Sequence, residues 1–165
     1  ARLATLLETE IWSRLAAQHD ATIVVDPRGY PYVGAGMSAC ARDLANFGLM
    51  IINDGAFDGR QIVPSDWIVD TVKGDSTSKE CFAQGAYGDD APGWHYRNQV
   101  WVTAADPAVM LAIGIHGQYV YMDKGLDLVI VMLSSQPQPF DEALDLRTMA
   151  AMSAVGSRLE ATSSR

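Results

Sequence analysis

Short and largely apolar segments recur in the second half of the chain and predict β-strands, and the segment that follows Gln118 has the alternating character of a strand. The predicted strands are 98–103, 109–113, 118–122 and 128–133. Asp123-Lys124-Gly125 is typical of a hairpin turn between the last two. Because strands joined by tight turns pair antiparallel, we expect one antiparallel sheet over about residues 98–133.

Helical spacing of apolar residues predicts helices on both sides of this region. The opening segment is amphipathic and carries apolar residues at Leu3, Leu6, Leu7, Ile11 and Leu15. Further helices are expected at 39–53, from Pro64 onward and at 140–159. Ser38 is the expected N-cap of the second helix. The combination of helices and an antiparallel sheet predicts an α+β fold.

Two other segments are expected to be irregular. A short strand at 21–26 leads through a turn into a Gly-rich loop at 30–36 that carries Tyr32 and Gly34. The stretch 73–93 is polar and Gly-rich, so it predicts a long surface loop, and such loops are usually functional or mobile.

Composition narrows the functional classes. The 165 residues are 48% hydrophobic and 19% charged, which suits one domain with a real core. The net charge of −8 and the lack of a basic run argue against a nucleic-acid partner. No apolar run approaches the roughly 20 residues of a membrane span. The first seven residues lack the features of a signal peptide, and we expect a cytoplasmic rather than a secreted protein.

The two cysteines, Cys40 and Cys81, are far apart and lack the spacing of metal ligands. We therefore expect reduced, packed thiols, no metal site and no cofactor.

The run Ile113–Gln118 is the strongest candidate for chemistry. Glycine lets a substrate approach the backbone closely, and an active-site strand offers main-chain N–H groups to a developing negative charge. His116, read as a strand residue, would flank whatever lies over the sheet. The alternative is a hydrogen-bonded core histidine, but core strands rarely place two glycines around a histidine. We predict that His116 is a site residue.

Three short motifs match serine hydrolases but do not fit their surroundings. Gly36–Cys40 resembles a nucleophile elbow, yet it follows a loop and not a strand, which favours Ser38 as a helix cap. Ser76–Lys79 matches Ser-x-x-Lys and Tyr96–Asn98 matches Tyr-x-Asn. The first of these two lies in the predicted polar loop, and only twenty residues separate them. We reject them as a catalytic set.

Aromatic residues gather just before the candidate strand, at Trp94, Tyr96 and Trp101. They could line a substrate cleft or pack against the sheet. Trp101 is favoured for the cleft wall because it lies on a predicted strand.

Several stretches, in order and with similar spacing, resemble the 6-aminohexanoate-dimer hydrolase family. They are Ile11–Leu15, His19–Asp26, Gly36–Ala45, Ile62–Trp67, Ile113–Gln118 and Leu133–Pro137. The resemblance implies a serine β-lactamase-like fold and an amidase or carboxylesterase. It covers nearly the whole chain but only the C-terminal half of the family's length. The family's Ser-x-x-Lys nucleophile and base, and its catalytic Tyr, have no counterpart here.

The resemblance also implies roles for individual residues. Ile115 matches the strand position whose backbone N–H forms half of the oxyanion hole, next to His116. The positions expected on the substrate side are Tyr32, Gly34, Trp101, Gly117, Gln118 and Phe140. Nylon-oligomer-cleaving members carry Asn where this chain has Gly34, a departure that puts that substrate in doubt. Phe140 is apolar, which favours a greasier acyl group or ester.

We expect the chain, residues 1–165, to be the C-terminal part of one β-lactamase-like hydrolase domain and to be inactive alone. Its expected partners are a small amide or ester and either the N-terminal half or a second copy of itself. Two alternatives stay open. One is a β-lactamase or D-amino-acid peptidase, although those usually carry Lys-Thr-Gly or His-Thr-Gly on this strand. The other is a penicillin-recognising binding module without catalysis.

Overall fold

A five-stranded antiparallel sheet, in the order β5-β6-β7-β8-β9, is the centre of the computed structural model, which describes residues 2–32, 34–106 and 108–163. Its strands are β5 (His95–Arg97), β6 (Val100–Val102), β7 (Val109–Gly114), β8 (Gln118–Asp123) and β9 (Leu128–Met132). The predicted antiparallel sheet and the α+β class are thereby confirmed, and the predicted strands 109–113, 118–122 and 128–133 agree closely with β7, β8 and β9.

Helices and two small hairpins surround this sheet. The helices are α1 (Arg2–Glu10), the 3-10 helix η1 (Trp12–Leu15), α2 (Ala41–Ile52), α3 (Ser65–Lys73), α4 (Ser76–Ala83) and α5 (Glu142–Ser163). The hairpins pair β1 (Thr22–Ile23) with β2 (Met37–Ser38), and β3 (Ala56–Phe57) with β4 (Arg60–Gln61). Among the described residues, none of the helices has the length and apolar character needed to cross a bilayer.

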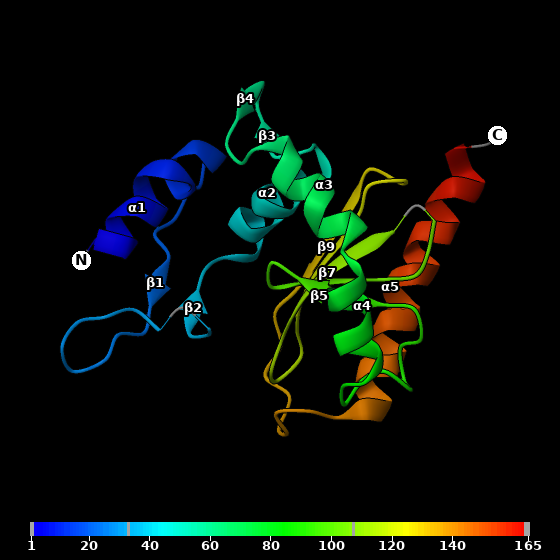
Figure 1. Cartoon of the computed structure of the whole chain (residues 1–165). Helices are drawn as coiled ribbons and strands as arrows, with labels where there is room; N and C mark the ends of the chain where they lie inside the picture. The colour runs from blue at the N-terminus through cyan, green and yellow to red at the C-terminus, as the bar shows by residue number, and fades with distance from the viewer. Residues whose placement is uncertain (1, 33, 107, 164–165) are drawn as a thin grey trace.

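The sheet lies between α2 and α5 (Figure 1), and strand alternation supplies each helix with an apolar surface. Met110 pairs with Met122, and both belong to the core that includes Met50 and Ile51 of α2. Their neighbours Leu111 and Tyr121 belong to a second core with Met152 of α5. The pattern of alternation therefore fixes which helix packs on which face.

Gly48 lets α2 approach the sheet closely. A Cβ added to Gly48 would lie 2.6 Å from Cγ1 of Val129, a β-branched side chain on β9. Gly156 of α5 is similarly crowded, because its added Cβ would lie 2.7 Å from Cδ1 of Leu126. The two contacts differ in what must move, since the end of a leucine side chain is more flexible than the branched Cβ of valine.

The predicted cap of the second helix is wrong. Ser38 lies in β2, and α2 begins after Cys40, whose side chain makes no capping hydrogen bond to the helix backbone. The predicted strand at 21–26 is also shorter in the structure, where regular pairing is confined to Thr22 and Ile23 with one bridge from Val25 to Pro31.

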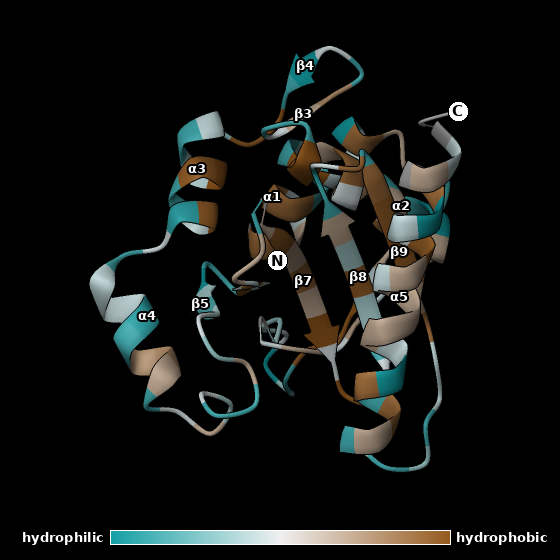
Figure 2. Cartoon of the chain, turned by 90° about the vertical axis from the view of Figure 1, so that its right-hand side faces the viewer, coloured by the Kyte–Doolittle hydropathy of each residue, from teal (hydrophilic) through white to brown (hydrophobic). Residues whose placement is uncertain are grey.

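The predicted loop at 73–93 contains helix α4, which the sequence pattern did not reveal. Its sequence is mostly hydrophilic (Figure 2), so an apolar stripe is lacking and Phe82 is its buried residue. The helix begins with a capping box, in which the Asp75 carboxylate accepts from Ser78 N–H and the Ser78 hydroxyl accepts from Asp75 N–H. Arg97 of β5 donates to both Asp70 and Asp75, which joins α3, α4 and the sheet edge.

We predict opposite outcomes for the two crowded glycines. Gly48→Ala should lower the free energy of unfolding by ~1–3 kcal/mol, because overpacking against Val129 outweighs the ~1 kcal/mol gain in helix propensity. Gly156→Ala should be neutral or stabilising by up to ~1 kcal/mol. Urea denaturation of both variants measures the difference. Equal losses would show that the approach of α2 to β9 is not tighter than that of α5.

Candidate active site

The turn between β7 and β8 consists of Ile115, His116 and Gly117. The prediction that His116 lies on a strand is therefore wrong. His116 has φ of 61° and Gly117 has φ of 77°. Three residues separate the paired strand ends Gly114 and Gln118, and positive φ is a conformation that glycine adopts freely. A non-glycine residue in this region costs free energy, so surrounding contacts must hold His116 there.

Those contacts come from the segment that follows β9. His116 N–H donates to the carbonyl of Pro139 at 2.9 Å, and Gln136 N–H donates to the carbonyl of His116 at 3.2 Å. His116 Nδ1 lies 2.8 Å from the carbonyl oxygen of Gln136. Because a carbonyl only accepts, Nδ1 donates its proton, and in the neutral ring Nε2 is left as an acceptor. The half-buried imidazole is thus fixed in one orientation.

Gln118 adds a second connection to the same segment. Its side-chain amide donates to the carbonyls of His116 and Ser134, and its Oε1 accepts from Ser134 N–H. Gly117 leaves the room that the Gln136 side chain occupies, since a Cβ added to Gly117 would lie 2.3 Å from Nε2 of Gln136. Within the described residues, the buried Oε1 of Gln136 has no hydrogen-bond partner. Hydrogen bonds from the segment 134–136 therefore hold the turn, and Oε1 of Gln136 is an acceptor without a donor among these described residues.

Ile115 begins the turn and remains open to solvent, with 66% of its surface exposed. A main-chain N–H on a rigidly supported turn can donate to an anionic oxygen without reorganisation. His116, which follows it directly, has its ring turned to the 136–139 segment through Nδ1. The two predicted catalytic positions are therefore neighbours with different environments, one exposed and one anchored.

Two predicted substrate-side residues, Trp101 and Phe140, are connected through Tyr87. The ring centroid of Tyr87 lies 5.1 Å from that of Trp101 and 6.5 Å from that of Phe140. Trp101 also makes edge contacts with Phe82 and Tyr96. Phe140 is 59% exposed and directly follows Pro139, the residue that accepts from His116 N–H. The sequence had predicted that Phe140 begins the last helix, but in the structure it precedes α5.

Tyr32 and Gly34 lie on the loop between β1 and β2, where Tyr32 is 63% exposed. Val33 between them lies outside the described residues. No hydrogen bond or ring contact within the described parts of the chain joins these two residues to the β7–β8 turn. The structure therefore brings six of the eight predicted site residues to one region. As far as the structure describes the chain, Tyr32 and Gly34 make no such contact with that region.

The described residues offer no evident nucleophile and base at this turn. Ser76 and Lys79 lie on α4 and are both exposed, and no hydrogen bond between them is found in this described segment. Burial, followed by the Asp145 carboxylate, raises the pKa of Tyr119, whose hydroxyl donates to that carboxylate. Burial also raises the pKa of Tyr121. Neither phenol is suited to accept a proton near neutral pH.

A surface hollow lies elsewhere and includes none of the predicted residues. It is lined by Leu49 of α2, by Asn53 directly after that helix and by the β3–β4 hairpin. Sequence reasoning missed Tyr87, Gln136 and Pro139, which support the turn and its aromatic neighbours. The signal for Gln136 was the matched stretch Leu133–Pro137, whose polar and proline residues follow the last strand.

Comparisons with known proteins show the family and agree with the fold. The model of the β-lactamase family matches residues 3–153. A curated relative, the 6-aminohexanoate-dimer hydrolase of Paenarthrobacter ureafaciens, is 36% identical over 138 residues, which are 84% of this chain and 35% of the relative. A solved structure of a Bacillus anthracis protein described as a 6-aminohexanoate-dimer hydrolase has a TM-score of 0.78 and 29% identity, covering 93% of this chain and 38% of that one. The chain thus spans about a third of the length of the relatives it matches.

The support beneath the turn can be tested with two glycines of similar φ. Gly59 has φ of 72° and open space where a Cβ would be, so Gly59→Ala should cost only the ~1–2 kcal/mol of the left-handed conformation. Gly117→Ala should cost ~1–3 kcal/mol more, because it also displaces Gln136. Adding Gln136→Ala to Gly117→Ala should remove part of this excess. Chemical denaturation provides the values, and equal costs at the two glycines would contradict the contact with Gln136.

Proposed function

Because the chain belongs to the β-lactamase family, whose members are serine hydrolases, we propose that it is the C-terminal part of an enzyme that cleaves amide or ester bonds through an acyl-enzyme. The observation that carries the proposal is the exposed turn at Ile115, held by hydrogen bonds between His116 and the segment 136–139. A rigid backbone donor of this kind suits acyl transfer, in which negative charge develops on the carbonyl oxygen.

In the proposed mechanism a serine hydroxyl attacks the substrate carbonyl and the tetrahedral oxyanion is stabilised by two N–H groups. The Ile115 N–H is one of them. His116 holds the turn in its left-handed conformation, so it positions the donor through the backbone. Gly117 and Gln118 keep the segment 134–136 against the turn. Water then hydrolyses the acyl-enzyme.

The serine, its lysine base and a catalytic tyrosine are proposed to belong to a part of the protein outside this chain. The support is twofold. The chain spans only 35% of its curated relative, and Ser76 and Lys79 are exposed without a hydrogen bond between them among the described contacts. The same proposal explains why apolar residues such as Ile113, Ile115 and Leu133 are exposed around the site. That surface would pack against the N-terminal half, or against a second copy.

The proposed substrate is a small amide or ester with an apolar acyl group. Phe140 and Trp101 present aromatic surface near the turn, joined through Tyr87. The 6-aminohexanoate-dimer hydrolase relative supports an amidase or carboxylesterase over the alternatives of a β-lactamase, a D-amino-acid peptidase or a non-catalytic module. Gly34 and Tyr32 would flank the substrate from the β1–β2 loop.

The isolated chain is expected to be catalytically silent. Loss of the whole catalytic set of a serine hydrolase costs on the order of a millionfold in turnover. Incubation with p-nitrophenyl butyrate should therefore give no saturable hydrolysis, and Ser76→Ala should behave like the unmodified chain. Saturable turnover that disappears in Ser76→Ala would place the nucleophile on α4 and reject the proposed division of the site.

In the intact protein, Ile115→Pro deletes the proposed oxyanion donor and should lower turnover by about a hundredfold or more, or ~3–4 kcal/mol. Ile115→Val keeps the N–H and should have nearly unchanged turnover. Steady-state kinetics on the same ester measures both, and circular dichroism checks that each variant folds. A folded proline variant that retained most of its turnover would show that Ile115 is not the donor.

A further inference from the structure

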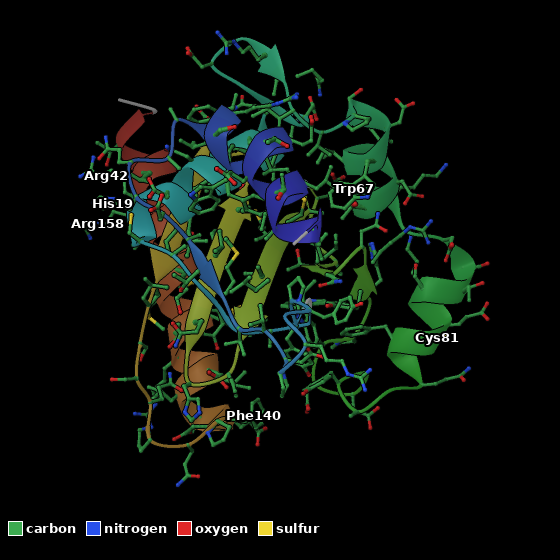
Figure 3. The ribbon with its side chains drawn as sticks, turned by 90° about the vertical axis from the view of Figure 1, so that its left-hand side faces the viewer. His19, Arg42, Trp67, Cys81, Phe140 and Arg158 are labelled. Carbon is green, nitrogen blue, oxygen red and sulfur yellow. The ribbon has the colours of Figure 1, made fainter. Side chains whose placement is uncertain are left out.

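Three potential metal ligands meet at the beginning of α2, away from the site described above. They are Nδ1 of His19, Sγ of Cys40 and the carboxylate of Asp43, all within 4.8 Å of one another. Cys40 is half-buried, whereas Cys81 is exposed and not packed as the sequence had led us to expect. Figure 3 shows Cys81 on the opposite side of the molecule from His19. The cluster therefore contains one thiol, one imidazole and one carboxylate.

The separations within the cluster match a tetrahedral metal site. Sγ of Cys40 lies 3.5 Å from Nδ1 of His19 and 3.1 Å from Oδ2 of Asp43. Nδ1 of His19 lies 3.6 Å from Oδ2 of Asp43. Zinc bonds of about 2.0–2.3 Å at tetrahedral angles place neighbouring ligand atoms about 3.3–3.6 Å apart. A zinc ion can thus bind all three atoms with small shifts, mainly at the Sγ–Oδ2 pair.

The fold holds these ligands in place before any ion binds. Asp43 is fully buried and its carboxylate accepts the N–H groups of Gln18 and His19. The hydrogen bond from Gln18 N–H is the main cause that lowers the pKa of Asp43. The indole of Trp12 donates to the carbonyl of His19. The His19 side chain is 65% exposed, which gives an ion access from solvent.

We propose that His19, Cys40 and Asp43 form a zinc site, with water as the fourth ligand. On binding, the Cys40 thiol loses its proton to solvent and forms a sulfur–zinc bond, while His19 binds as the neutral imidazole through Nδ1. The thiolate and carboxylate together balance the charge of Zn²⁺. A nitrogen, sulfur and oxygen donor set selects zinc and related transition metals over Mg²⁺ or Ca²⁺. The site would clamp both ends of residues 20–39, the segment that carries Tyr32 and Gly34.

Cobalt(II) is the probe, because a cobalt–thiolate bond gives a charge-transfer band in the near ultraviolet that Zn²⁺ abolishes on displacement. Titration of the tag-free, reduced chain should give this band at one Co²⁺ per chain. Cys81→Ser, the matched control, should give the same band. Cys40→Ser should lose the band, and His19→Gln should weaken Zn²⁺ binding by more than about tenfold, since even indirect partners of a metal cost roughly 10- to 100-fold.

A second measurement needs no variant. Zn²⁺ should protect Cys40 of the unmodified chain from iodoacetamide and leave Cys81 reactive, as read by mass spectrometry of the peptides. This outcome counts even where Cys40→Ser fails to fold, and His19→Gln changes an exposed side chain. Absence of stoichiometric Co²⁺ and Zn²⁺ binding, a thiolate band that persists in Cys40→Ser or disappears in Cys81→Ser, or equal alkylation of Cys40 with and without Zn²⁺ would overturn the proposal.

Discussion

The hydrogen bonds between His116 and the segment after β9 are the interaction on which the candidate site depends. His116 occupies a left-handed conformation that a non-glycine residue avoids unless its surroundings impose it. The carbonyls of Gln136 and Pro139 supply that constraint from one side of the turn. The same contacts place Phe140 beside the turn. One set of hydrogen bonds thus holds the turn that carries the proposed backbone donor, and it ends next to an aromatic residue.

The sheet provides the rigidity that this turn needs. β7 and β8 pair along their whole length, from Val109 with Asp123 to Gly114 with Gln118. β9 ends opposite Tyr119, so the chain leaves the sheet beside the turn that it supports. α2 and α5 cover the two faces of the sheet (Figure 1), so the proposed site lies at the end of this hairpin. In acyl transfer, a donor that does not need to reorganise stabilises the oxyanion most.

The apolar runs of β7, β8 and β9 were strong enough to predict these strands from the sequence, because both faces of the sheet pack against apolar partners. Local chemistry was less informative where polar contacts decide the structure. Helix α4 depends on the Asp75 capping box and on Arg97, and it has no apolar stripe to detect. His116 was predicted on a strand because glycines and β-branched residues occur in both strands and hairpin turns.

The site could be predicted only where one stretch of sequence carried it. Ile115 to Gln118 are consecutive, and the family resemblance marked them. Contacts such as that of Tyr87 with Phe140, or of His19 with Cys40, join residues far apart in the chain, and spacing alone gives no sign of them. The comparisons show the family, while the roles proposed for individual residues come from the resemblance and are supported by the geometry of the turn.

The most direct test of the central claim is a crystal structure of the intact protein with a phosphonate that mimics the tetrahedral intermediate. The account predicts a covalent bond from phosphorus to a serine outside residues 1–165. It also predicts that the Ile115 nitrogen lies about 2.7–3.1 Å from a phosphonyl oxygen, the distance of an oxyanion donor. A phosphonate bound to a serine of this chain, or one whose oxygens lie away from the β7–β8 turn, would contradict it.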